Sequence, residues 1–431
     1  MILENDRNEV VDKTRLGQRD VFGEEDDHEI QYKTLSWQFV AFLMIAEIVS
    51  NGMLSLPNAM AAVSIVPSLV LTIFLGTLAL FTAKLLIDFK LNHPEVHNMG
   101  DAGYIMFGPV GREILSLGTI IFAIFACGSE LLSGQLALST LSHSGLCAVI
   151  LLLIFSAATF LGSIASWLGF ASTLCIVLCG VLGIVGAGIN PTAGRIIAAT
   201  VSSSFYDAFL AITGPVFIRF FTLISEMRRP QDAMKAAWTL QVFATIYYAV
   251  FSAVVYVYLG NAVQSPALLS LSPVWSKIIF AMGLANFLIS GALYAHTAAK
   301  LVFVRVFRRS RHLYSHTLPG WSTWILLCFA TTAIAFILAS AVPIFSDLVG
   351  ITASVFASWY TYGIAGFFWL YDTYYLCGGK HALRRRWIGT ILVVLIILAG
   401  AFICVAGTYV SVKLIVEAYD SGTVGRPFAC S

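Results

Sequence analysis

The stretch from residue 45 to residue 60, IAEIVSNGMLSLPNAM, combines the apolar side chains of a membrane-crossing helix with residues that do not belong there. These are Glu47, the run Ser50–Gly52, and Pro57. A carboxyl group inside a bilayer is costly and usually marks a functional position. Glycine permits backbone conformations that other residues avoid. We therefore expect the helix to be interrupted at Ser50–Gly52, where main-chain groups would become available to a ligand.

A second interruption is expected near the middle of the apolar stretch 203–225, at Thr213, Gly214 and Pro215. Proline lacks an amide hydrogen and suits the first turn of a new half-helix. Interrupted segments at matching places in two halves of a chain are the pattern of an inverted-repeat transporter with a site near the membrane midplane. Two ordinary kinks remain the alternative, because membrane helices tolerate glycine and proline.

Such breaks would suit the two charges of an amino acid zwitterion. The free N–H groups of one half-helix attract a carboxylate, and the free carbonyl groups of another attract an ammonium group. The candidate substrate-binding residues in the two breaks are Ser50, Asn51, Gly52 and Met53, and then Ala211, Thr213 and Gly214.

Two buried carboxyl groups are further candidates. Glu47 lies one helical turn before Asn51 on the same face. It could carry a coupled proton or hold the break in place. Glu130 could line an outer vestibule and attract a cationic group, or it could bond locally to Ser129 or Ser133.

Other polar residues inside apolar stretches leave two interpretations each. Arg219 either pairs with a carboxylate or binds an anionic substrate group. His296, followed by Thr297, either carries a coupled proton or is a hydrogen-bonded core residue. Lys300 either takes the place of a bound cation or snorkels to the cytoplasmic interface. Tyr360 either covers an apolar substrate side chain or simply packs.

The composition identifies an integral membrane protein. Of 431 residues, 58% are hydrophobic and 11% are charged, whereas soluble domains average about 45–50% apolar and about 25% charged residues. The mean hydropathy is +0.86. A transmembrane helix needs about 20 apolar residues. We predict an all-α polytopic protein with eleven spans, at 37–60, 66–88, 111–140, 145–162, 168–189, 203–225, 238–260, 274–303, 321–342, 348–375 and 388–412.

Lys and Arg residues in the connections predict the orientation. The even-numbered connections are basic, as at Arg384–Arg386, and the odd-numbered ones carry almost no Lys or Arg. Basic loops face the cytoplasm, so eleven spans place the N-terminus inside and the C-terminus outside. Residues 1–35 hold ten acidic and five basic residues, which predicts a mostly disordered cytoplasmic tail. The transporter domain would cover 36–412 and a short extracytoplasmic tail 413–431.

Several long blocks of the sequence resemble the fungal neutral amino acid permease branch of the amino acid/auxin permease family. They are AEIVSNGMLSLPNAM, LLIDFKLNHPEVHNMGDAGYIMFGPVGREI (85–114), FTLISEMRRPQDAMKA (221–236), YAHTAAKLVFVRVFR (294–308) and SGTVGRPFAC (421–430). The resemblance covers nearly the whole chain apart from the first 30 or so residues.

The resemblance implies a LeuT-type fold of 5+5 inverted repeats, at about 37–189 and 203–375, with an eleventh helix at 388–412. It also implies secondary active import of neutral aliphatic or aromatic amino acids, by proton symport in the fungal branch. The sixth helix, AITGPVFIRFFTLISEM (211–227), departs from the family pattern: it is about two residues longer and contains Arg219. This departure leaves open a carrier of a specialised amino-acid-derived metabolite.

Two other classes of protein are alternatives: a sensor and an enzyme. A non-transporting amino acid sensor would keep the breaks, but it should add a long cytosolic domain. An enzyme is not expected: His97 and Asp101 only loosely resemble an acyltransferase pair, and no HExxH zinc motif occurs.

No metal or cofactor is predicted. A proton gradient is favoured over sodium, because we see no hydroxyl-rich sodium site in the sequence. The expected partners are a small amino acid or derivative and the lipid bilayer, with no nucleic acid. We expect a monomer in the plasma membrane, with the vacuolar membrane as the alternative.

Overall fold

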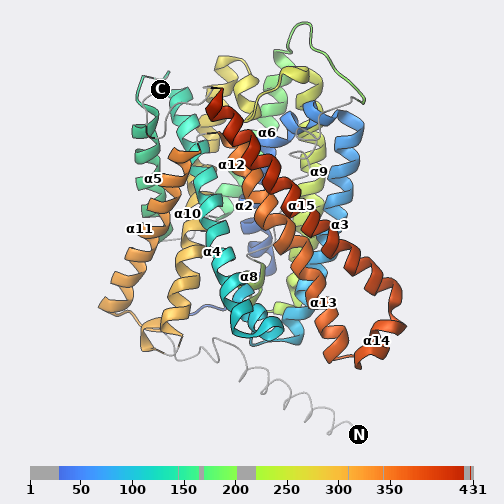
Figure 1. Ribbon diagram of the computed structural model, residues 1–431. Coiled ribbons are helices and arrows are strands. Elements are labelled where there is room, and N and C mark those ends of the chain that lie inside the picture. Colours follow the sequence, from blue (N-terminus) through green and yellow to red (C-terminus); the bar gives the residue numbers. More distant parts are fainter. Residues whose placement is uncertain are drawn as a thin grey trace.

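The computed structural model describes residues 29–143, 145–164, 169–200, 220–308, 310–342, 344–421 and 428. Long helices packed side by side make up this part of the chain (Figure 1). Its α-helices are α2 (Trp37–Val63), α3 (Ile65–Asn92), α4 (Met99–Leu141), α5 (Ala148–Ile164), α6 (Gly169–Ile189), α8 (Phe220–Ser225), α9 (Ala233–Leu259), α10 (Pro273–Phe307), α11 (Leu318–Ala341), α12 (Phe345–Thr352), α13 (Ile364–Tyr375), α14 (Gly379–Arg385) and α15 (Trp387–Asp420).

Most of the predicted spans correspond to helices of the structure. Within the described residues, eight helices are long and apolar enough to cross a membrane. The first helix, α2, makes a ninth if its two bent limbs form one span. The predicted fourth span is α5, an apolar helix of 17 residues. The predicted sixth span lies mostly outside the described residues, and only its end is seen, as α8.

Helix α4 begins well before its predicted span of 111–140. Asn98 caps its first turn, and the Asn98 side chain accepts a hydrogen bond from the amide of Asp101 at 3.0 Å. The helix then turns at Gly108, whose φ of 69° lies in the left-handed region that favours glycine. Pro109 follows and starts the second limb. The short first limb therefore forms an elbow against the apolar limb.

The predicted span 348–375 is built from three pieces rather than one α-helix. A π-helix, η5 (Ala353–Gly363), lies between α12 and α13. Helix α15 packs closely against η5 at Gly400, where an added Cβ would lie 2.8 Å from the carbonyl oxygen of Ser358. Helix α15 also runs to Asp420, eight residues past its predicted end at 412. Long π-helical stretches are rare and often mark functional regions.

The connections α3–α4, α8–α9 and α10–α11, together with α14, gather at the lower end of the bundle in Figure 1. They contain most of the Lys and Arg residues of the predicted even-numbered connections, and we call this the basic end. The segment before α2 is fixed here by the parallel bridge Leu35–Met227. The Leu35 amide donates to the Glu226 carbonyl at 3.0 Å, and the Arg228 amide donates to the Leu35 carbonyl at 2.9 Å.

Candidate functional site

Helix α2 bends where the sequence predicted an interruption, although its backbone stays helical from Trp37 to Val63. Its limbs Trp37–Ser50 and Gly52–Val63 meet at an angle of 44°. In a regular helix, the carbonyls of Ala46, Glu47 and Ile48 would bond only to amides four residues later. Here each also accepts a hydrogen bond from a side chain of a neighbouring helix. The bend is therefore held by side chains of α9 and α10.

Helix α10 supplies the donors to two of these carbonyls. The Ser290 hydroxyl and the Asn286 amide donate to the Ala46 carbonyl at 3.1 and 3.3 Å. The Tyr294 hydroxyl donates to the Glu47 carbonyl at 3.3 Å. The Glu47 side chain is itself buried. These contacts fix the limb Trp37–Ser50 of α2 against one helical turn of α10.

Helix α9 supplies the third donor. The Tyr248 hydroxyl donates to the Ile48 carbonyl at 2.6 Å. The Tyr248 ring lies against Gly52, and a Cβ added there would come within 2.8 Å of its Cζ atom. The next residue, Met53, is fully buried, and its sulfur accepts a hydrogen bond from the Tyr247 hydroxyl at 3.2 Å. Gly52 is therefore required by its close packing against Tyr248.

A buried carboxyl group lies directly against the break. The Ser50 hydroxyl donates to Glu130 Oε2 at 3.1 Å, and both residues are 0% exposed. Among the described residues, Glu130 Oε1 has no hydrogen-bond partner. The hydroxyls of Ser129 and Ser133 donate to main-chain carbonyls of α4. Glu130 is thus joined to the first break across 80 residues of sequence instead of bonding to its neighbours.

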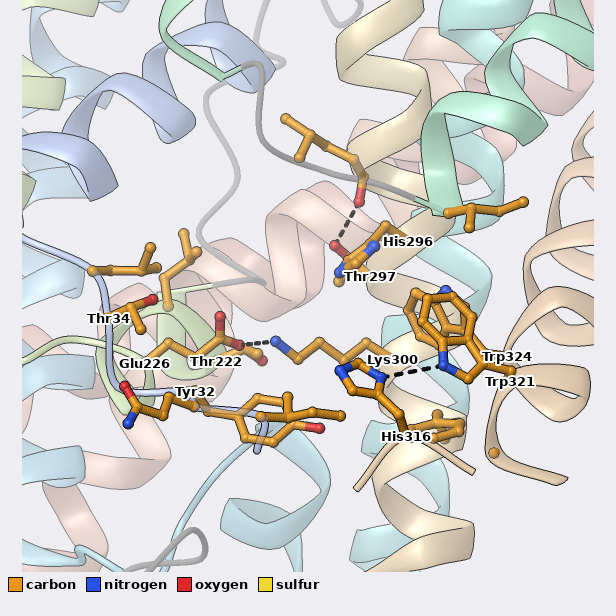
Figure 2. A pocket seen from close by; sticks show the side chains of 18 of the residues that line it. Tyr32, Thr34, Thr222, Glu226, His296, Thr297, Lys300, His316, Trp321 and Trp324 are labelled. Carbon is orange, nitrogen blue, oxygen red and sulfur yellow. Dashed lines mark hydrogen bonds and ion pairs between the residues drawn. The ribbon is translucent and has the colours of Figure 1, made fainter. Parts of the chain in front are cut away.

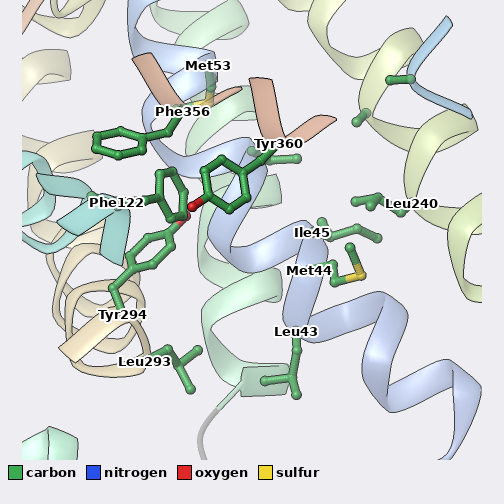
Figure 3. Packing of buried hydrophobic residues seen from close by; sticks show 14 of the residues in the cluster. Leu43, Met44, Ile45, Met53, Phe122, Leu240, Leu293, Tyr294, Phe356 and Tyr360 are labelled. Carbon is green, nitrogen blue, oxygen red and sulfur yellow. The ribbon is translucent and has the colours of Figure 1, made fainter. Parts of the chain in front are cut away.

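Aromatic rings from three elements gather beside the break (Figure 3). The Phe122 ring lies 6.0 Å from both Tyr294 and Phe356, measured between centroids. Tyr360 completes this aromatic cluster at 6.5 Å from Phe356, and its hydroxyl donates to the Leu115 carbonyl at 2.9 Å. Of these four residues, only Tyr360 was predicted from the sequence. The other three rings lie on separate spans, and no local pattern marks their convergence.

Several predicted site residues lie outside the described part of the chain. These are Ala211, Thr213, Gly214 and Arg219, with the second predicted break. For Asn51 the backbone is described as helical, but the side chain is not. The described part of the candidate site is therefore its first half, namely the break in α2 and the groups around it.

A cavity of about 410 Å³ lies between the break and the basic end (Figure 2). It is lined by the segment before α2, by α2, α8 and α10, and by the start of α11. The predicted residues His296, Thr297 and Lys300 all line this cavity. Lys300 forms an ion pair there, because its Nζ lies 2.8 Å from Glu226 Oε1.

The two other predicted residues of α10 also have defined partners. The Nδ1 atom of His296 lies 3.0 Å from the Ser163 carbonyl, which can only accept, so we assign the proton to Nδ1. The His296 ring meets Trp324 edge-on at 4.8 Å. The Thr297 hydroxyl donates to the Leu293 carbonyl at 2.7 Å within α10. His296 is therefore a bonded residue on the cavity wall.

The two residues of the enzyme-like pair, His97 and Asp101, stabilise the basic end. His97 is buried, and burial lowers the pKa of its imidazole well below the usual range, with Lys300, Lys90 and Arg308 adding to the effect. Asp101 accepts a hydrogen bond from Arg308 at 2.9 Å. Across the described ranges, no group of three His, Cys, Asp or Glu side chains could hold a metal ion.

The fold is that of LeuT-type transporters. The structure is similar to MhsT solved in complex with L-phenylalanine (TM-score 0.54, 14% identity, 90% of this chain and 100% of that one). It is also similar to the nucleobase-cation-symport-1 transporter Mhp1 (TM-score 0.54, 14% identity, 92% and 95%). A manganese transporter of Eremococcus coleocola gives a TM-score of 0.57 at 12% identity, over 93% and 92%.

Relatives at the sequence level are fungal. The N amino acid transport system protein of Neurospora crassa is 28% identical, over 95% of this chain and 91% of its own length. A transmembrane transporter of Gibberella moniliformis is also 28% identical, over 96% and 90%. The model of the transmembrane amino acid transporter protein family matches residues 33–413. This match spans the break, the aromatic cluster and most of the residues that line the cavity, and the chain accordingly belongs to that family, the amino acid/auxin permeases.

Proposed function

We propose that the protein imports neutral aliphatic or aromatic amino acids by proton symport with alternating access. The observation that carries this proposal is the 44° bend of α2 beside Glu130, a fully buried carboxyl group bonded to Ser50. The family and the names of the relatives indicate a transport protein rather than an enzyme.

The break offers the groups that an amino acid requires. The limb Gly52–Val63 begins at the bend, so its helix dipole favours a carboxylate there, and its first amides would become available if the bend opened further. The carbonyls of Ala46, Glu47 and Ile48 already accept side-chain donors. The ammonium group would therefore bind elsewhere, and the open oxygen of Glu130 is the nearest suitable acceptor that we identify. The aromatic cluster beside the break favours an apolar or aromatic side chain.

Glu130 is our candidate for the proton-carrying group. When its carboxyl is ionised, the bond from Ser50 is charge-assisted, and such bonds are roughly twice as strong as neutral ones. Protonation would weaken this link between α2 and α4 and so bias the angle at the break. Glu47, buried one turn earlier in α2, is the second candidate for proton coupling.

We further propose the 5+5 inverted repeat with α15 as the eleventh helix, and a basic end that faces the cytoplasm. Cys147, between α4 and α5, is disulfide-bonded. Disulfides persist in oxidising surroundings, which supports an extracellular position for the opposite end. The proposal places the tail 1–35 inside and residues 413–431 outside, in a monomer of the plasma membrane.

The test is uptake into proteoliposomes from a mixed pool of amino acids, with an inward proton gradient and an inward sodium gradient imposed in turn. We expect neutral amino acids to accumulate with the proton gradient alone. Accumulation that requires sodium would reject proton symport. Binding without accumulation under either gradient would indicate a sensor, and accumulation of only an amino-acid derivative would indicate a specialised carrier.

A further inference from the structure

We propose that the cavity at the basic end is a second binding site for the transported amino acid. In this release site, Lys300 would bind the substrate carboxylate and Glu226 would bind its ammonium group. The inference rests on the transport function proposed above and assigns a second, separate site along the same path.

The position of the cavity suits a site between the break and the basic end. Tyr294 of α10 holds the Glu47 carbonyl at the break. Lys300 follows six residues later on the same helix, a rise of about 9 Å. His296 and Thr297 line the cavity between these two levels. A substrate that leaves the break toward the basic end would therefore enter this cavity.

The cavity has the size of a binding site rather than of a water pocket. Its 410 Å³ falls within the range of about 300–1,000 Å³ that is usual for small-molecule sites. A single water accounts for only about 30 Å³ of liquid volume. An amino acid with an aromatic side chain would thus fit beside several waters.

The charges in the cavity match both ends of a zwitterion. Lys300 Nζ and Glu226 Oε1 are 2.8 Å apart, with side chains 17% and 14% exposed. Charges so poorly hydrated need partners. If the zwitterion enters, the single ion pair Lys300–Glu226 is replaced by two, carboxylate with Lys300 and ammonium with Glu226. The net charge of the cavity is zero before and after the exchange.

The walls hold these two charges on separate elements. Glu226 follows directly on α8, and its carbonyl accepts a hydrogen bond from the Leu35 amide at 3.0 Å. Lys300 belongs to α10, and its ammonium lies 5.0 Å from the centre of the Tyr32 ring, a cation–π distance. Separate anchors let the two side chains move apart for a ligand without unfolding either helix.

The remaining wall would receive the substrate side chain. Figure 2 shows Trp321 and Trp324 on the far side of Lys300 from Glu226. Phe303 lines the same cavity and meets Trp324 edge-on at 5.6 Å. A ligand with its charges at the ion pair would point an apolar or aromatic side chain toward these rings.

The first test is the stoichiometry of radiolabelled L-phenylalanine bound to the purified full chain at equilibrium. We expect two molecules per wild-type chain and one for Lys300→Gln. Lys235→Gln is the matched control and should leave two, because Lys235 pairs with Asp232 at 2.7 Å and does not line the cavity. Gly52→Val should also leave one molecule, the one bound in the cavity.

The second test separates a binding site from an ion pair that merely locks two helices. On the Gly52→Val variant, phenylalaninamide (no carboxylate) and phenylpropionate (no ammonium) should each compete at least ten-fold less well than L-phenylalanine. The charge exchange Lys300→Glu with Glu226→Lys should restore the second molecule, because both charges are again present.

Either of two results would overturn the inference. One is a single molecule on the wild-type chain that Lys300→Gln does not affect. The other is equal competition by L-phenylalanine and its two analogues. The outcome for transport is read separately: uptake with only one bound molecule would reject the release site and keep the transporter. If a second molecule binds in a way that depends on Lys300 but no uptake occurs, the release site is kept and the transport function is rejected.

Discussion

The substitution Gly52→Ala should impair transport more than it impairs folding. The added methyl group would lie 2.8 Å from Cζ and 3.2 Å from Cε1 of Tyr248. Real Cβ atoms do not approach ring carbons so closely, so the Tyr248 ring must move away from α2. Its hydroxyl would then leave the Ile48 carbonyl, from which it is now 2.6 Å distant.

The size of the effect follows from these two losses. Overpacking by one methyl group costs about 1–3 kcal/mol, and the lost hydrogen bond costs about 0.5–1.5 kcal/mol. Alanine has a higher helix propensity than glycine, and this difference stabilises the folded helix by up to about 1 kcal/mol. This gain stabilises the folded chain but favours a straight α2. A net cost of about 2–3 kcal/mol on the bent state corresponds to a roughly 30- to 160-fold loss of uptake.

The assay is initial uptake by proteoliposomes at equal protein content, with thermal unfolding of the same samples. Tyr248→Phe removes only the hydroxyl and should cost about five-fold for a bond of about 1 kcal/mol. Gly188→Ala is the control, because its Cβ would lie at an ordinary 3.5 Å from its nearest neighbour, the Tyr258 ring. Uptake by Gly52→Ala within two-fold of the wild type would refute the reasoning.

Three further predictions concern ionisable groups. Glu130→Gln should abolish accumulation driven by a proton gradient but retain amino acid exchange, because the glutamine oxygen still accepts a hydrogen bond from the substrate ammonium group but carries no proton. Glu417→Gln on exposed α15 should change neither, and loss of exchange in Glu130→Gln would argue against a proton-carrying role. Ser50→Ala leaves a buried carboxyl oxygen without its donor, and it should destabilise the protein by about 1–3 kcal/mol, measured as a lower Tm in detergent. His97 has a pKa below its unfolded value of 6.5. The unfolded chain therefore binds the extra proton, and stability should fall as pH drops below about 6.5, by at most about 1.4 kcal/mol per pH unit. Unfolding of the wild type and His97→Gln at several pH values tests this, and equal slopes would exclude His97 as the cause.

The sequence predicted the features that depend on local chemistry. The apolar stretches marked the helices, and the run Ser50–Gly52 marked the bend in α2. The contact between Ser50 and Glu130 could not be predicted, because it depends on how α2 packs against α4. The π-helix η5 was also missed, since an apolar stretch does not reveal whether its backbone bonds span four or five residues.

The elbow of α4 shows an intermediate case. Gly108 and Pro109 are visible in the sequence as a turn signal, but they precede the predicted span at 111 and were not connected with it. Lys300 forms its ion pair with Glu226, the residue directly after α8, and the two lie 74 residues apart along the chain. Pairings of this kind arise from tertiary packing and leave no mark in local composition.

The two backbone hydrogen bonds between Leu35 and the end of α8 have a practical consequence for protein engineering. A force applied to the chain before Glu29 passes first to the α10–α11 connection, where the Ile30 amide donates to the Tyr314 carbonyl and the Tyr32 hydroxyl donates to the Leu313 carbonyl. It then passes through the bonds of Leu35 to the residues after α8, which include Glu226. A bulky fusion or a surface tether at the N-terminus would therefore pull on the mouth of the cavity. The end of α15 makes no such connection to α8 among the described residues, and it is the better place for a fluorescent label or an affinity tag.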